Sequence, residues 1–334
     1  MLPAFGLYTH IRANRWRSAF LIAGLFFLFY LMTFGLMLLL LAFTDDGSGT
    51  FKGFLREAAD ITIWLGGPVV TILVGLWVLF GLHFNEWIVN ATTGSDAITR
   101  LDNPELYNLL QNLCISRGLT MPKLRILETE APNAFASGIR PDQHTITVTR
   151  GLLEILDRRE LEAVLAHELT HIRNGDVRTM VIAVLVVGVM SLVGEAVFRV
   201  LEARGGRSSG KDSGARAGAL AVAFLCIGIA WLLSVVVRFS LSRRREYLAD
   251  AGAVELTKNP DAMISALRKI EGKGELQGMP SAIMELCLDN PRSGFDDLFA
   301  THPSIEERID ALVRYAGGRP VTAPVLAEPD APAA

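Results

Sequence analysis

Long stretches without a charged residue alternate along this chain with segments of regular polar and apolar periodicity. Residues 18–44 and 61–85 contain no Asp, Glu, Lys or Arg, and each exceeds the roughly 20 residues that cross a ~30 Å hydrocarbon core as a helix. Residues 179–194 and 217–237 are also uncharged, although the first of these two stretches is shorter than that length. The pattern predicts two clear transmembrane helices, and then a second hydrophobic helical pair within 179–237.

The remaining segments have the periods of a soluble domain of mixed α/β character. Short strands are predicted at 123–127, 133–137 and 144–149, and the last of these, HTITVT, alternates in the manner of a half-buried strand. Helices with N-cap residues or capping boxes are predicted at 103–117, 157–174, 259–270 and 304–315, and a further helix is predicted at 242–256. The sequence therefore predicts a mostly α-helical membrane protein that carries a small sheet.

This pattern divides the chain into six parts. They are a lead at 1–17, the two spans at 18–85, a first soluble part at 86–178, the hydrophobic pair at 179–237, a second soluble part at 238–316, and a tail at 317–334. The tail is rich in Pro and Ala without periodicity, which predicts disorder.

Basic residues predict the orientation of the chain in the membrane. Arg12, Arg15 and Arg17 precede the first span, whereas the loop at 45–60 holds only two basic residues. Basic flanks stay on the cytoplasmic side, so the lead and both soluble parts are predicted to be cytosolic. The link at 199–216 carries five basic residues and opposes export, although the length of 217–237 favours a crossing.

Composition excludes several classes of protein. Of 334 residues, 51% are hydrophobic, and the formal net charge of −3 offers no basic surplus for a nucleic-acid partner. Three widely spaced cysteines, with no C-x-x-C pair, indicate neither a disulfide framework nor a cysteine metal site.

The segment HELTH carries the candidate chemistry. Its residues His167 and His171 are four apart and share one helix face, so both can bind one zinc ion, while Glu168 reaches a water on the metal. Zinc lowers the pKa of a bound water to roughly 7, and a carboxylate beside it can act as the base. A surface helix with two solvated histidines is the alternative interpretation.

A third ligand is needed, and the other histidines lie on no obvious second helix face. In EYLAD, Glu246 and Asp250 are four residues apart and share a face, so one could bind the metal and the other could orient a ligand or the water. An exposed acidic edge facing the neighbouring arginines is equally compatible with the spacing. Asp176 is placed outside the site, because it falls off the ligand face unless the helix ends at Gly175.

Several segments together resemble one family. HELTH followed by NGD, the upstream NAFASG, the downstream REYLADAGA and the later THPSIEERI are similar to the HtpX-type membrane zinc metalloproteases, relatives of the CAAX prenyl proteases. The similarity runs from the first span to about residue 315. It implies a zincin-like catalytic domain with an edge-strand sheet, and one Zn²⁺ per chain.

The resemblance also implies roles for individual residues. Glu246 corresponds to the third zinc ligand, and Asp250 to the acid that supports the ligands. Asn133 corresponds to a residue on the edge strand that holds the substrate backbone. His302 corresponds to a histidine that stabilises the oxyanion.

The sequence thus predicts a zinc endopeptidase of the bacterial inner membrane, with its active site facing the cytoplasm. The resemblance implies quality control of membrane or misfolded proteins, with the lipid bilayer as surroundings. A prenyl-protein protease stays an alternative, as does a silent membrane scaffold fixed by zinc. Because the ligands must meet on one side, both stretches of 179–237 must cross or neither does, and we expect two crossings. Oligomeric state and individual substrates are left open.

Overall fold

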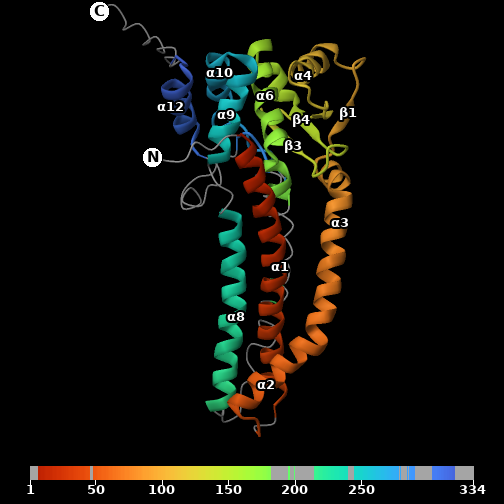
Figure 1. Cartoon of the computed structure of the whole chain (residues 1–334), viewed down its shortest axis with the longest axis vertical. Coiled ribbons are helices and arrows are strands. Elements are labelled where there is room, and N and C mark those ends of the chain that lie inside the picture. Colours follow the sequence, from red (N-terminus) through yellow and green to blue (C-terminus); the bar gives the residue numbers. More distant parts are fainter. Residues whose placement is uncertain are drawn as a thin grey trace, which may run out of the picture.

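The computed structural model places a globular domain at one end of an apolar helical bundle (Figure 1). The bundle consists of α1 (Leu7–Thr44), α3 (Gly67–Thr93) and α8 (Gly214–Phe239). The helix α2 (Phe51–Ile61) lies at the opposite end, between α1 and α3. The structure describes residues 7–45, 48–181, 195, 199, 214–239, 244–277, 279, 284, 286–289 and 303–319.

Within these residues, three helices are long and apolar enough to cross a membrane. They are Ile22–Thr44, Phe51–Phe84 and Gly214–Leu233. Both predicted spans and the fourth uncharged stretch are therefore helical. The third stretch, 179–194, lies outside the described residues except for 179–181, so the crossing pair stays a prediction.

The segment between the first two spans is largely helical, although the sequence was interpreted as a loop at 45–60. Thr50 caps α2 by accepting a hydrogen bond from the N–H of Gly53, and Phe54 and Ala58 are buried. A single π-helical stretch, η1 (Thr62–Gly66), joins α2 to α3 without a break. The apolar pair four residues apart gives α2 a buried face against the bundle.

The sheet contains four strands within the described residues. These are β1 (Asp96–Ile98), β2 (Lys123–Leu127), β3 (Ala134–Ser137) and β4 (Thr145–Thr149). Their order is β1-β2-β4-β3, and only the pairing of β2 with β4 is parallel. The sequence predicted β2, β3 and β4 but not the short β1. The strand β3 lies at an edge, which bears on substrate binding below.

The prediction that the strand at 144–149 is half-buried was wrong, because every residue of β4 is buried. Ile146 and Val148 face the main core. The opposite face holds the threonines, and there Phe135, the register partner of Thr147, joins a second apolar cluster with Val89 of α3. A sheet with both faces covered buries its threonines together with its aliphatic residues.

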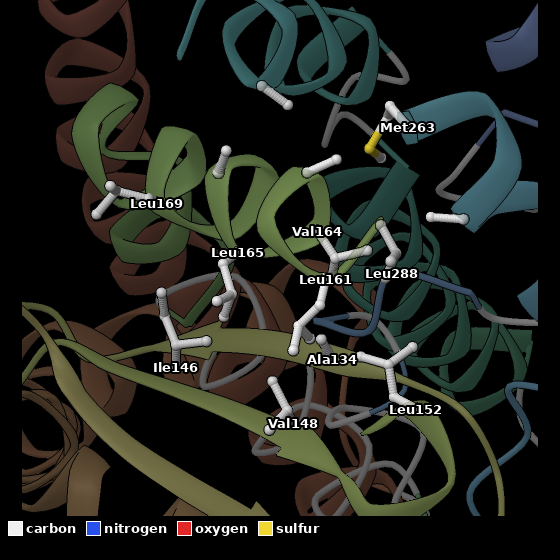
Figure 2. Close-up of a cluster of buried hydrophobic side chains, with 14 of the residues drawn as sticks. Ala134, Ile146, Val148, Leu152, Leu161, Val164, Leu165, Leu169, Met263 and Leu288 are labelled. Carbon is white, nitrogen blue, oxygen red and sulfur yellow. The ribbon is translucent and has the colours of Figure 1, made fainter. Parts of the chain in front are cut away.

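Local capping signals fix the helices of the globular domain. These helices are α4 (Pro104–Arg117), α5 (Arg150–Ile155), α6 (Arg158–Asn174), α9 (Arg244–Thr257), α10 (Pro260–Ile270) and α12 (Ile305–Ala316). Both predicted capping boxes are present, Asp157 with Glu160 on α6 and Ser304 with Glu307 on α12. Figure 2 shows α6 lying on the sheet, with Leu161 and Leu165 pointing toward β4.

Small residues allow α9 to approach α6 closely. A Cβ added to Gly252 would lie 2.4 Å from Cγ2 of Thr170, far inside van der Waals contact. Ala249 and Ala253 of the same helix are fully buried. Because a larger side chain would separate the helices, this seam sets the distance between the histidines of α6 and the acidic residues of α9.

Candidate metal centre

Three side chains from α6 and α9 converge inside the globular domain. His167 and His171 lie one turn apart on α6, and their Nε2 atoms are 3.1 Å apart. Glu246 of α9 places its Oε2 3.6 Å from each of these nitrogens. All three residues are buried. The structure therefore brings together the two histidines of HELTH and one of the two acidic residues of EYLAD.

This spacing fits a single tetrahedral metal ion. Zn–N and Zn–O bonds of ~2.0–2.2 Å at tetrahedral angles place ligand atoms about 3.3–3.5 Å apart, and the three observed separations lie close to that value. Two imidazoles and one carboxylate are a common ligand set for catalytic zinc. Among the described residues, these three form the one group whose donor atoms converge in this way.

The charges around the triad favour a divalent cation. Four buried carboxylates lie in or beside it, together with two buried guanidinium groups: Glu168, Asp176, Glu246, Asp250, Arg245 and Arg308. With neutral histidines these groups leave a formal charge of −2, which one divalent ion balances. Buried charges that stay unbalanced are costly, so the surroundings match a metal of that charge.

Each histidine is held by an acidic residue through its second nitrogen. Nδ1 of His167 lies 2.9 Å from Oδ1 of Asp250, and Nδ1 of His171 lies 3.1 Å from Oδ2 of Asp176. An Nδ1–H donated to a carboxylate leaves the Nε2 lone pair free for a metal. The expectation that Asp176 lies outside the site was wrong, because the helix ends at Gly175, whose φ of 72° turns the chain back toward His171.

Arg308 is a site residue that the sequence analysis missed. Its Nε and Nη2 donate to the two carboxylate oxygens of Asp250 at 2.9 and 2.7 Å, although α12 lies far along the chain. Burial would raise the pKa of Asp250, but Arg308, with help from His167, outweighs burial and lowers it. Asp250 thus stays ionised and able to orient His167.

Arg245 is a second residue that the spacing argument did not assign. Its Nε donates to Oε1 of Glu246 at 3.1 Å, which leaves Oε2 directed at the histidines. Each acidic residue of α9 in the site is therefore held by a guanidinium group, Glu246 by Arg245 and Asp250 by Arg308. The available signal in the sequence was the short run of arginines directly before EYLAD, one of which could pair with Glu246.

Two protonation equilibria distinguish the site from ordinary surface groups. Burial raises the pKa of Glu168, against the opposing effect of both histidines. Burial opposes protonation of His171, but Glu246 and Asp176 together outweigh it and raise its pKa to about 10. The metal-free site consequently retains a proton that a cation must displace.

Asn133 precedes the edge strand β3, but its side chain holds the chain's own backbone. Nδ2 donates to the carbonyl oxygens of Gly274 and Asp289, each at 2.6 Å. Oδ1 accepts from the N–H groups of Ala134 and Asp289. His302, the fourth residue for which a catalytic role was predicted, lies outside the described residues.

Comparison with known proteins gives a consistent result. A model of "Peptidase family M48" matches residues 100–316. A "Protease HtpX homolog" of Bacteroides fragilis (strain YCH46) is 36% identical over 320 residues, which covers 93% of this chain and 99% of that protein. The homologue of the same name from Listeria monocytogenes serotype 4a (strain HCC23) is 35% identical over 323 residues, with 92% and 99% covered.

Among solved structures, the chain is similar to that titled "Crystal Structure of S. mikatae Ste24p". It has 17% sequence identity and a TM-score of 0.46, and the match covers 73% of this chain. The chain spans 57% of the length of that protein.

Proposed function

The chain belongs to peptidase family M48 and is a membrane metalloprotease, and on that premise we propose that it is a zinc endopeptidase whose ligands are His167, His171 and Glu246. The observation that carries this proposal is the convergence of three buried donor atoms at 3.1–3.6 Å. Zinc bound there supplies a Lewis acid and a water of lowered pKa.

Glu168 is the proposed general base. It follows His167 directly on α6 and is buried beside the triad. The raised pKa of Glu168 is nearer to neutral pH than that of an ordinary glutamate. A group whose pKa lies near the operating pH both accepts and returns a proton efficiently. Glu168 takes a proton from the attacking water and later gives it to the leaving amine.

Asp250, Asp176 and Arg308 are proposed as positioning residues. The two carboxylates hold the imidazoles through Nδ1, and Arg308 holds Asp250 with two hydrogen bonds. Losing such outer contacts typically costs 10- to 100-fold in metal affinity. For His302 we retain the oxyanion role that the family resemblance implies.

Substrate is proposed to bind as an extended strand along β3, with Asn133 holding its backbone. The edge position of β3 supports this, because an extended peptide can add to a sheet edge through main-chain hydrogen bonds. We propose membrane or misfolded proteins as substrates and the cytoplasmic side of a bacterial inner membrane as the location. The arginines before the first span and the bacterial relatives support that orientation.

The test is a conservative substitution of the base with a matched control on the same helix. Glu168→Gln should retain one zinc per chain but lower cleavage of an unfolded protein by about 10²- to 10⁴-fold or more, because an amide cannot accept the water's proton. Glu162→Gln makes the same chemical change away from the triad, at a half-buried position of α6, and should cleave normally. The measurement is zinc content and initial rate in detergent.

Cleavage by Glu168→Gln at the rate of the control would reject the mechanism. A zinc-loaded wild-type protein that cuts no unfolded or membrane protein would instead favour the silent scaffold. Cleavage restricted to prenylated peptides would favour the prenyl-protein protease.

A further inference from the structure

The outer edge of β3 is already occupied by a segment of the same chain. Phe135 pairs with Cys287 in an isolated antiparallel bridge, and the N–H of Leu288 donates to the carbonyl of Ala134 at 2.9 Å. We refer to residues 286–289 as the edge segment. Among the described residues, it lies where a peptide extending the sheet beyond β3 would lie.

The pairing has the form of an added strand and not of a chance crossing. The bond from residue 288 to residue 134 flanks the opposed pair 135 and 287, as in the non-hydrogen-bonded pairs of an antiparallel ladder. An extended peptide that joins a sheet edge forms the same main-chain bonds. The edge segment therefore occupies the carbonyl of Ala134, one of the β3 groups that a substrate strand would need.

Asn133 is engaged by the same segment. Its amide donates to the carbonyl of Asp289 and accepts from the N–H of that residue. Its second amide bond goes to Gly274, whose own N–H donates to the side chain of Asp289 at 3.1 Å. The residue proposed to hold the substrate backbone thus already holds two main-chain carbonyls.

The edge segment also lies against the catalytic groups. The carbonyl of Leu288 accepts a hydrogen bond from Nη1 of Arg308 at 3.1 Å, and Arg308 in turn holds Asp250. Cys287 is buried next to the base: burial, and after it the charge of Glu168, raises the pKa of its thiol. Figure 2 shows Leu288 directed into the same apolar cluster as Ala134 and Leu161.

We propose that the edge segment is an internal substitute for substrate, and that an extended stretch of an unfolded polypeptide must displace it from β3 and Asn133 before cleavage. This rests on the proposed function, because it assigns β3 as the substrate edge. The partner that fits is a chain without stable structure, since such a chain presents free main-chain groups along its whole length. Most main-chain groups of a folded protein are already paired, so folded proteins should displace the edge segment less readily.

The first experiment compares two substitutions that remove the same apolar side chain. Both variants, Leu288→Pro and Leu288→Ala, remove the buried leucine side chain. Only Leu288→Pro also removes the backbone N–H that donates to the carbonyl of Ala134. If the edge segment blocks substrate, Leu288→Pro should cleave reduced, carboxymethylated α-lactalbumin about 2- to 10-fold faster than Leu288→Ala, the range that one net hydrogen bond provides. Equal or slower cleavage by the proline variant, at equal zinc content, overturns the proposal.

The second experiment needs no proteolysis and uses the native thiols. Cys287 and Cys114 are both buried, at 1% and 2% exposed, but only Cys287 lies in the edge segment. In zinc-loaded Glu168→Gln, a saturating amount of the carboxymethylated protein should speed maleimide labelling of Cys287 at least about threefold and leave Cys114 unchanged, since local opening exposes one region alone. Peptide mapping by mass spectrometry reports each site.

Binding of the unfolded protein, followed by fluorescence anisotropy, separates the two proposals. Binding without faster labelling of Cys287 overturns the edge-segment proposal, even if wild-type cleavage is normal. Equal acceleration at both cysteines indicates global opening and overturns it too. If Cys287 of Glu168→Gln is labelled faster but the zinc-loaded wild type cleaves no unfolded protein, the displacement proposal is supported and the proteolytic function is rejected.

Discussion

The apolar bundle and the globular domain place opposite kinds of side chain on their surfaces. Trp64 of η1 is 79% exposed, and Ile72 and Leu79 of α3 are 62% and 63% exposed, so large apolar groups face outward. In the globular domain most exposed residues are polar, and the charged groups of the candidate metal centre are buried. The bundle is suited to lipid, whereas the charged interior requires compensating partners.

This difference shows which interactions each region depends on. Within the bundle, apolar surface gains little from helix contact, because lipid is equally apolar, and close packing decides association. Around the metal centre, ion pairs, hydrogen bonds and a cation must be complete, since any missing partner leaves a buried charge. The two regions should therefore respond differently to similar substitutions.

The largest effect is expected from removing a charge at the centre of the globular domain. Glu246→Ala should abolish stoichiometric zinc binding, because two histidines alone leave the ion with too few protein ligands. Asp250→Ala, which removes only an outer contact, should weaken zinc by about 10- to 100-fold. Zinc content after dialysis against graded chelator measures both.

Glu255→Ala is the matched control, since this glutamate lies on the same helix but forms exposed ion pairs with Arg117 and Arg173. Its zinc content should equal that of the wild type. One zinc per chain in Glu246→Ala would refute the assignment of Glu246 as a ligand and would require a different third ligand.

A smaller effect is expected from adding one methyl group to each region. Gly252→Ala should force α9 away from Thr170 and cost about 1–3 kcal/mol, as overpacking of a close seam does. Gly228→Ala adds the same methyl to α8, where no atom lies within 4 Å of the new Cβ. That variant should be neutral to within about 1 kcal/mol.

Thermal unfolding of both variants in detergent, with zinc present, measures the contrast. The Gly252 variant should also bind zinc more weakly, because the shift of α9 carries Glu246 with it. Similar unfolding midpoints for the two variants would show that α9 can move away from α6 at little cost. The contact at Gly252 would then not determine the distance between Glu246 and the histidines.

The smallest effect concerns a proton. The pKa of metal-free His171 is raised well above its ordinary value, so at pH 8 the ring is protonated and zinc must expel that proton. Zinc binding at pH 8 should release about one proton from this residue, in addition to any from bound water. Asp176→Asn removes one cause of the raised pKa and should reduce the release.

Calorimetric titration in buffers of different ionisation enthalpy counts these protons. Identical release by wild type and Asp176→Asn would mean that Asp176 does not hold His171 in the metal-free state. The same comparison at pH 6 should give a smaller difference, because lower pH favours the protonated ring in both proteins.

Local signals in the sequence predicted most of the fold. Capping boxes predicted the starts of α6 and α12, and uncharged length predicted the apolar helices. The complete burial of β4 could not be predicted from its alternation of threonine with aliphatic residues, because threonine occurs on solvent-exposed and on buried faces of a sheet. Its covering comes from residues such as Val89, which are distant in sequence.

The site was predicted as far as spacing within single helices allows. His167 and His171 share a helix face, and the choice of Glu246 over Asp250 needed the family resemblance. Arg308 was missed although a signal existed, since it falls on the apolar face of its helix with Ile305 and Ile309. The edge segment has no periodicity, and only non-local pairing with β3 defines it.

The order of the site residues along the chain has a consequence for synthesis. His167 and His171 leave the ribosome first, Glu246 follows only after the apolar stretch that forms α8, and Arg308 comes near the end. A nascent chain that stops before α9 has two histidines and no third ligand. With Glu246 as the proposed third ligand, proteolytic competence would be acquired late, after α8 has been made, and an unfinished chain would lack a complete zinc site.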